Sequence, residues 1–250
     1  QDLHDGRALS EGLQNLDEKY NSPWFIHHAV KAHYPSDTWF RVNEIYIYFY
    51  ETFSLEECCE LGAIIQGACY KARFEAARRK WPKTSMAINW CFNEPWPNVS
   101  CTNVLDYYRR PKLAYWMLRD AYRPRNLSLR YDKLLWKAQE EYRAQIFVSN
   151  DLEPVPSFTL VVTVYDDEGN TAYEQTATAS AGENTSGQIG EIVLTVPPCR
   201  GMWIELYSPE LRITSRYFMA VENEQGKIDR QAVRAFVADY LSHKAPVPED

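Results

Sequence analysis

The sequence predicts an α+β fold, in which the incomplete C-terminal portion of a (β/α)8 barrel is followed by an antiparallel β-sandwich. Three observations support this prediction. Two helical patterns flank a short apolar run before residue 122, six short alternating runs follow up to residue 221, and a polar segment ends the chain. We therefore expect a barrel portion at residues 1–122, a sandwich at residues 123–221, and a C-terminal helix and tail at residues 222–250.

The first helix is predicted to begin after Ser54. Ser54 and Glu57 form a capping-box pattern, in which each side chain pairs with the other residue's backbone N–H. Apolar residues then recur at steps of three and four, which places them on one helical face. These residues are Leu55, Cys58, Gly62, Ile65, Cys69, Ala72 and Ala76. The basic residues 78–80 suit the C-terminal end of a helix, and Pro82 ends the run.

A short apolar run, residues 85–92, predicts a buried strand, and the Pro-containing loop 93–97 cannot continue it. Pro111 suits the first turn of a second helix, which extends to about Ala121. Helix, strand, loop and helix is the order found in α/β barrels. In such barrels, residues at the C-terminal ends of strands belong to the active-site face.

The sandwich is predicted from six short runs in which polar and apolar residues alternate. These runs are residues 142–148, 158–165, 171–178, 191–196, 203–207 and 212–219. Residues 166–170 carry the Asp/Gly pattern of a hairpin turn. Short strands at this spacing over about one hundred residues indicate an immunoglobulin-like β-sandwich.

The candidate functional residues lie around the loop 93–97. Retaining glycosidases use two carboxyl groups ~5–5.5 Å apart, one as acid and one as nucleophile. An Asn-Glu pair at a strand end, here Asn93 and Glu94, is one way to present the acid, and Trp90 and Trp96 would stack on a sugar. The alternative interpretation is a connecting loop whose tryptophans belong to the core.

Four segments in order carry a resemblance to a known family. Residues 87–97 (AINWCFNEPWP) and 104–115 (VLDYYRRPKLAY) resemble the last barrel strand and helix of family-2 glycoside hydrolases, above all β-mannosidases and exo-β-glucosaminidases. Residues 25–35 resemble the His-rich segment of that family, and residues 148–155 (VSNDLEPV) resemble the opening of its sandwich domain. The resemblance implies the C-terminal part of a retaining exo-β-glycosidase that acts in carbohydrate breakdown.

The same resemblance assigns roles to individual residues. It implies that Trp90, Asn93, Glu94 and Trp96 bind substrate, although Glu94 replaces the usual Asp of the family. Glu94 would lie on the eighth barrel strand and not on the fourth, where the acid is found, so its expected role is substrate contact or structure. The chain has no Ser-Glu-Phe-Gly-like nucleophile sequence. We therefore expect no catalytic residue in this chain, with both carboxylates upstream of Gln1, and an inactive fragment. Asp106, Tyr107 and Tyr108 match the family motif as packing residues.

Two other hypotheses remain open. In the second hypothesis, the chain is a non-catalytic carbohydrate-binding or scaffolding protein. In the third, it is a self-sufficient hydrolase that uses Glu94. For any of the three, an incomplete barrel leaves sheet edges and apolar helix faces uncovered, and we expect association with another chain through that surface. The expected ligand is a β-linked oligosaccharide or glycoside.

Charge and hydropathy exclude other partners. The formal net charge of −7 argues against a nucleic-acid partner, and no apolar run approaches the ~20 residues of a membrane span. The start of the chain lacks a methionine and a signal pattern, which suggests a processed or cut fragment, and a mature secreted protein is the alternative. The compartment stays open, and a periplasmic or secreted location is favoured for the parent protein.

The sequence predicts neither a cofactor nor a metal site. The six cysteines lie at irregular positions, and none of the five histidines completes a set of zinc ligands with them. We interpret the cysteines as small buried residues, and a bridge between Cys91 and Cys101 is the alternative. Asn-x-Ser sequons at Asn98, Asn126 and Asn184 matter only in a eukaryotic secretory protein, and we interpret them as chance occurrences.

Overall fold

The computed structural model describes residues 48–49, 55–96 and 102–244. Its longer helices are α5 (Leu55–Arg79), α6 (Leu113–Ala121) and α7 (Arg230–Ser242). The chain forms two compact units, one of Gln1–Gln66 with Ile88–Tyr115 and one of Gly67–Ala87 with Trp116–Asp250. The protein is therefore α+β, as the sequence predicts.

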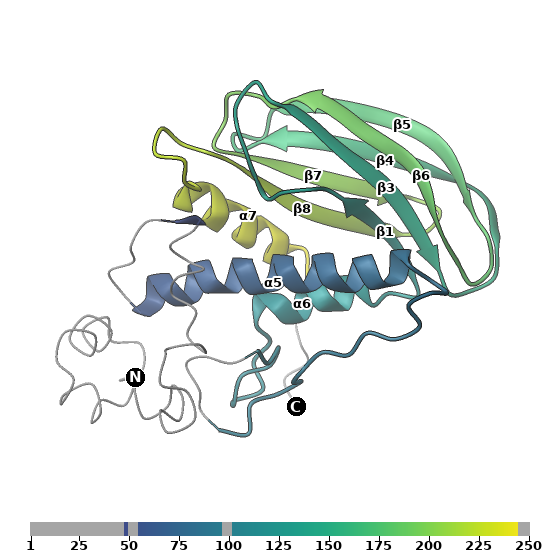
Figure 1. Cartoon of the computed structure of the whole chain (residues 1–250), viewed down its shortest axis with the longest axis horizontal. Coiled ribbons are helices and arrows are strands. Elements are labelled where there is room, and N and C mark those ends of the chain that lie inside the picture. The colour runs from purple at the N-terminus through teal and green to yellow at the C-terminus, as the bar shows by residue number, and fades with distance from the viewer. Residues whose placement is uncertain (1–47, 50–54, 97–101, 245–250) are drawn as a thin grey trace. The chain divides into compact units, whose positions relative to one another are not determined.

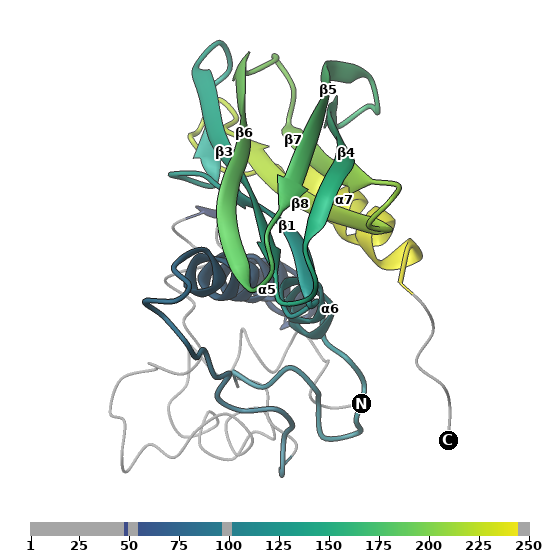
Figure 2. The same ribbon diagram turned by 90° about the vertical axis from the view of Figure 1, so that its right-hand side faces the viewer.

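The second unit contains two β-sheets that face each other (Figure 1, Figure 2). The strands are β1 (Arg125–Arg130), β2 (Leu135–Trp136), β3 (Glu141–Asn150), β4 (Val155–Asp166), β5 (Thr171–Ala181), β6 (Thr185–Thr195), β7 (Gly201–Ser208) and β8 (Ile213–Val221). One sheet has the order β1-β3-β6 and the other the order β2-β8-β7-β4-β5. All pairs are antiparallel except β2 with β8.

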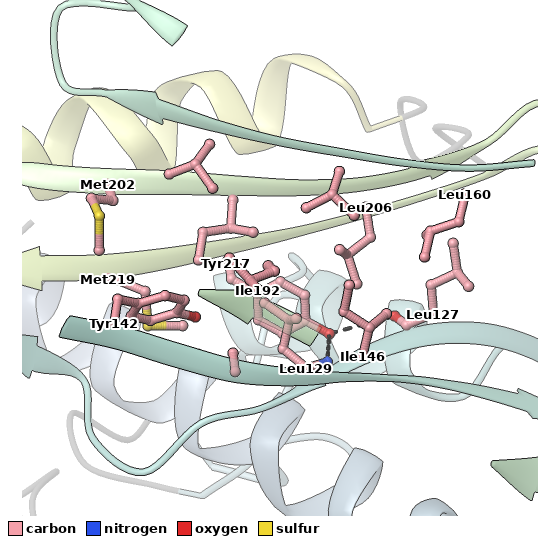
Figure 3. Close-up of a cluster of buried hydrophobic side chains, with 14 of the residues drawn as sticks. Leu127, Leu129, Tyr142, Ile146, Leu160, Ile192, Met202, Leu206, Tyr217 and Met219 are labelled. Carbon is pink, nitrogen blue, oxygen red and sulfur yellow. Dashed lines mark hydrogen bonds between the residues drawn. The ribbon is translucent and has the colours of Figure 1, made fainter. Parts of the chain in front are cut away.

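The core between the sheets follows directly from the alternation in the sequence. Every second residue of β3, β4 and β7 is buried, so that Ile146, Leu160 and Leu206 point into the same interior (Figure 3). Trp136 and Tyr142 pack edge to face in this core, with ring centroids 4.8 Å apart. Each fully buried large apolar side chain stabilises the fold by about 1.5–3 kcal/mol.

Helix α7 packs on the outer face of β7 and β8. Its Phe236 ring lies 6.1 Å from Trp203 and 5.4 Å from Phe218. The helix begins at Asp229, whose carboxylate accepts a hydrogen bond from the backbone N–H of Ala232 at 2.9 Å. This N-cap satisfies one of the free donors of the first turn.

The second half of α5 is joined to the sandwich by a buried polar cluster around Glu75. The Tyr217 hydroxyl donates to both carboxylate oxygens of Glu75 at 2.9 Å, and Lys71 Nζ lies 2.7 Å from one of them. Lys71 also donates to the Ser215 hydroxyl at 3.0 Å. Burial, followed by the charge of Glu75, raises the pKa of Tyr217 well above its usual value, so the phenol stays protonated and donates.

A second buried carboxylate, Asp120, joins α6 to the end of α7. Tyr240 donates to Asp120 at 2.5 Å, and Lys244 Nζ lies 2.6 Å from the same oxygen. Burial alone would raise the pKa of Asp120, but the charges of Lys71 and Lys244 and the hydrogen bonds from Lys244 and Tyr240 together lower it. Asp120 is therefore ionised at neutral pH and serves as a structural anion.

The structure confirms some predicted elements and corrects others. The first helix is α5, although its proposed capping residue Ser54 lies outside the described residues. The buried strand predicted at 85–92 is wrong: this segment is irregular, and Ile88, Trp90 and Phe92 are exposed. A strand needs a ladder partner, and the segment has none among the described residues. Pro111 lies in an isolated bridge before α6 and not in its first turn.

Replacing Tyr217 by phenylalanine should destabilise the sandwich unit. The variant removes the donor to both oxygens of the buried Glu75 carboxylate, and an under-satisfied buried charge costs about 1–3 kcal/mol. Urea unfolding of the variant would measure the loss. The control is Tyr207→Phe on the exposed surface of β7, which should change the free energy of unfolding by less than about 0.5 kcal/mol. Equal effects of the two variants would contradict the role given to the cluster.

Candidate functional site

The candidate site lies in the first unit, where two segments hold each other by backbone hydrogen bonds. The Phe92 carbonyl accepts from the N–H groups of Val104 and Leu105 at 3.1 and 3.0 Å, and the Lys112 N–H donates to the Val104 carbonyl at 3.0 Å. Isolated bridges join Asn93 to Leu105 and Leu105 to Pro111. These contacts place the segment 88–96 beside the segment that leads into α6.

Glu94 is the buried member of the site. Only 2% of its side chain is exposed, and its Oε1 accepts a hydrogen bond from Lys112 Nζ, whose side chain is 27% exposed. The two residues are 18 positions apart in the chain, so the ion pair fixes the loop to the start of α6. A carboxylate in this arrangement is held by a cation and is almost closed to solvent.

The other three predicted site residues are exposed. The side chain of Trp90 is 77% exposed and that of Trp96 is 50% exposed, and Asn93 is exposed between them in sequence. The Trp90 carbonyl accepts from the Thr102 hydroxyl, and the Asn89 amide donates to the Cys91 carbonyl at 2.7 Å. The indoles are therefore presented by a segment whose backbone is tied down.

Sequence reasoning missed a second aromatic group in this unit. Tyr107 and Tyr108 were expected to pack, but both are exposed and meet edge to face with centroids 5.3 Å apart. Arg110 lies over the Tyr108 ring at 5.1 Å, and its Nε donates to Asp106 Oδ2 at 2.6 Å. The charged residues on both sides of the tyrosine pair were the available signal for exposure.

Metal and membrane features are absent from the described part of the chain. Residues 48–49, 55–96 and 102–244 contain no group of three or more His, Cys, Asp or Glu residues that could hold a metal ion. The His-rich segment 25–35, with His27, His28 and His33, lies outside these residues. No described helix combines the length and apolar character needed to cross a membrane. Cys91 is a free thiol, and Cys101, its partner in the alternative bridge, lies outside the described residues.

Comparison with known proteins gives β-mannosidases and an exo-chitosanase among the similar proteins. No protein-family model matches the chain. A 95-residue stretch, 36% of this chain, is 26% identical to β-mannosidase B from Thermothelomyces thermophilus and covers 11% of that protein. Among solved structures, the β-D-mannosidase from Dictyoglomus thermophilum matches 86% of this chain with a TM-score of 0.63 and 21% identity. The exo-chitosanase from Amycolatopsis orientalis in complex with PNP-β-D-glucosamine matches 82% with a TM-score of 0.59 and 17% identity.

The matches confirm the resemblance predicted from the sequence. At these identities the structural likeness shows a shared fold. The chain spans 26% and 24% of the two solved structures, about a quarter of their length. The chain thus resembles part of a β-mannosidase or exo-β-glucosaminidase, and the resemblance does not extend to a whole relative.

Replacing Lys112 by methionine should leave the buried Glu94 carboxylate without its cation. Breaking a buried pair from one side is more costly than removing both partners. Solvent at the partly exposed Lys112 reduces the loss, so we expect about 1–3 kcal/mol from denaturant unfolding. The double variant Glu94→Gln/Lys112→Met should recover most of that loss. If the double variant were as unstable as Lys112→Met, the ion pair would not be the reason.

Proposed function

We propose that this chain is the C-terminal part of a retaining exo-β-glycosidase of the β-mannosidase type, which hydrolyses O-glycosidic bonds in carbohydrate breakdown. In this proposal, residues 1–122 are the last part of a TIM-type barrel, residues 123–221 an immunoglobulin-like sandwich, and residues 222–250 a C-terminal helix and tail. The agreement of the sequence match and the fold match on β-mannosidases supports it.

The observation that carries the proposal is the arrangement of the loop 90–96. Two exposed indoles, Trp90 and Trp96, stand on either side of the buried Glu94 in sequence. An indole packs against the apolar C–H face of a sugar, while hydroxyl groups take polar partners such as the exposed amide of Asn93. The ion pair of Glu94 with Lys112 keeps the backbone between the two indoles in place. This set of groups suits a pyranoside ring.

Glu94 acts in this proposal as a positioning residue. A general acid has to reach the leaving oxygen and exchange a proton with it. The Glu94 side chain is 2% exposed and is held by a lysine, so it is poorly placed for that exchange. Retaining hydrolysis needs two carboxyl groups ~5–5.5 Å apart. Both would come from parts of the parent enzyme outside this chain.

A second candidate function is carbohydrate binding without catalysis. Both indoles are exposed, and the neighbouring Glu94 carboxylate is already paired with Lys112. This arrangement also fits a binding module or scaffold. The two candidates agree on the ligand and differ on whether a catalytic segment exists in the same protein. The parent reading frame upstream of Gln1 distinguishes them, because only the enzyme requires a Ser-Glu-Phe-Gly-like strand there.

The purified 250-residue chain should have no glycosidase activity. Without a nucleophile and a general acid, only binding groups remain. Release of the aryl group from β-mannosides, β-glucosaminides, β-galactosides and β-glucuronides would be followed at high protein concentration. The Glu94→Gln variant should be as inactive as the unsubstituted 250-residue chain. Turnover that Glu94→Gln abolishes would instead identify the chain as a self-sufficient hydrolase.

Replacing Trp90 by alanine should remove most of the sugar-dependent change in tryptophan fluorescence. The chain holds only part of a sugar site, so we expect binding of mannose or glucosamine in the millimolar range, about 4 kcal/mol. The measurement is a fluorescence titration with mannose or glucosamine of the unsubstituted 250-residue chain and of its variants Trp90→Ala and Trp96→Ala. Tyr207→Phe, which changes an exposed aromatic residue in the other compact unit, is the control. A titration unchanged by both loop variants would rule out the indoles as a sugar platform.

A further inference from the structure

The three Asn-x-Ser sequons differ in their place in the fold. Asn98 lies outside the described residues, and Asn126 is only 2% exposed within β1, where its amide lies 3.5 Å from Glu75. Asn184 lies in the turn between β5 and β6 and is exposed, followed by Thr185 and Ser186. We propose that Asn184 is an acceptor site for an N-linked glycan and that the indole of Trp81 supports the first sugar.

The turn presents the Asn184 amide in a fixed geometry. Asn184 has a positive φ of 48°, a conformation that Asn adopts more readily than most residues. The Gly182 carbonyl accepts from Thr185 Oγ1 at 2.9 Å and from the buried Asn150 amide at 2.7 Å. The side-chain amide of Asn184 makes no hydrogen bond with any described residue, so it is available for modification.

The third residue of the sequon is also in place. The Ser186 hydroxyl lies 2.9 Å from the Ser149 hydroxyl on the neighbouring strand β3. The ladder of β6 with β3 begins at Thr185, which pairs with Asn150, and Ser186 pairs with Ser149, while Asn184 stays outside that ladder. A glycan attached to Asn184 therefore replaces no ladder pair of Asn184 itself in the folded chain. A glycan on Asn126 would instead have to displace the packing of β1 against α5.

Trp81 gives the second, independent observation. Its Nε1–H donates to the backbone carbonyl of Asn184 at 2.8 Å, and the residue is 46% exposed. The indole is thus tethered at the acceptor residue with nearly half of its surface open. A sugar attached to Asn184 can place its apolar C–H face on that indole, as sugars do on aromatic rings.

The modification is a group transfer without oxidation or reduction. A bond forms between Asn184 Nδ2 and the anomeric carbon of an oligosaccharide donated by a polyprenyl diphosphate. The bond between that carbon and the diphosphate oxygen breaks, and the polyprenyl diphosphate leaves with the electron pair. Asn184 Nδ2 loses one proton to a base of the transferring enzyme. The hydroxyl of residue 186 is part of the recognised sequon.

The occupancy test uses the full chain secreted from a eukaryotic host. Peptide mass spectrometry should find a glycan on Asn184, which an endoglycosidase removes, and no glycan on Asn126 in the folded fraction. Asn184→Asp should lose that glycan while keeping a residue that tolerates positive φ. Ser186→Thr, the matched control, keeps the sequon and should keep the glycan. A folded, secreted chain with an unmodified Asn184 would overturn the proposal.

The contribution of Trp81 is measured by thermal unfolding before and after enzymatic removal of the glycan. A sugar that packs on the indole should raise the midpoint by roughly 1–3 °C. In Trp81→Ala, the glycan should still be attached and the shift should disappear. The same shift in both chains would overturn the role of Trp81 as the support of the first sugar.

Discussion

The interaction on which the rest of the sandwich unit depends is the burial of the Glu75 carboxylate between α5 and the sandwich. A charge removed from water must be paired and hydrogen-bonded. Its partners come from three elements: Lys71 one turn earlier in α5, Tyr217 from β8 and Asn126 from β1. Rotating the helix by one residue, about 100°, would carry the carboxylate away from these partners. The carboxylate therefore fixes the register of the helix on the sheet, which apolar contacts alone would allow to slide.

The same constraint explains how the C-terminal segment is held. Asp120 at the end of α6 is also buried and ionised; Lys244 and Arg123 form ion pairs with it, and the charge of Lys71 lowers its pKa. Lys71 thus acts on both carboxylates, one in its own helix and one in α6. Tyr240 completes the link by donating from α7 to Asp120. Residues 120 or more positions apart are joined through these donors, so local structure cannot replace the contacts if a donor is removed.

The parts of the fold that could be predicted are those with one buried face. Strands β3, β4 and β7 alternate in sequence because one side meets the core, and each was predicted within a few residues of its observed ends. Strand β1 was missed because α5 covers its outer side, so that the consecutive residues 126–129 are all buried and no alternation remains. The apolar run 85–92 shows the converse failure, since composition cannot reveal whether a neighbouring strand exists to pair with it.

For the candidate site, the sequence motif supplied the residues and the structure supplied their exposure. No local pattern links Glu94 to Lys112, because their pairing depends on the path of the chain between them. Once this pairing is known, the three carboxylates buried in the described part of the chain share one property. Glu75, Asp120 and Glu94 each form an ion pair with a lysine and are buried from solvent, so each stabilises the fold. A general acid must be free to give its proton to a substrate, whereas aromatic rings bind sugars without any proton transfer. The proposed role of the loop 90–96 in sugar binding therefore depends on its exposed indoles and not on Glu94.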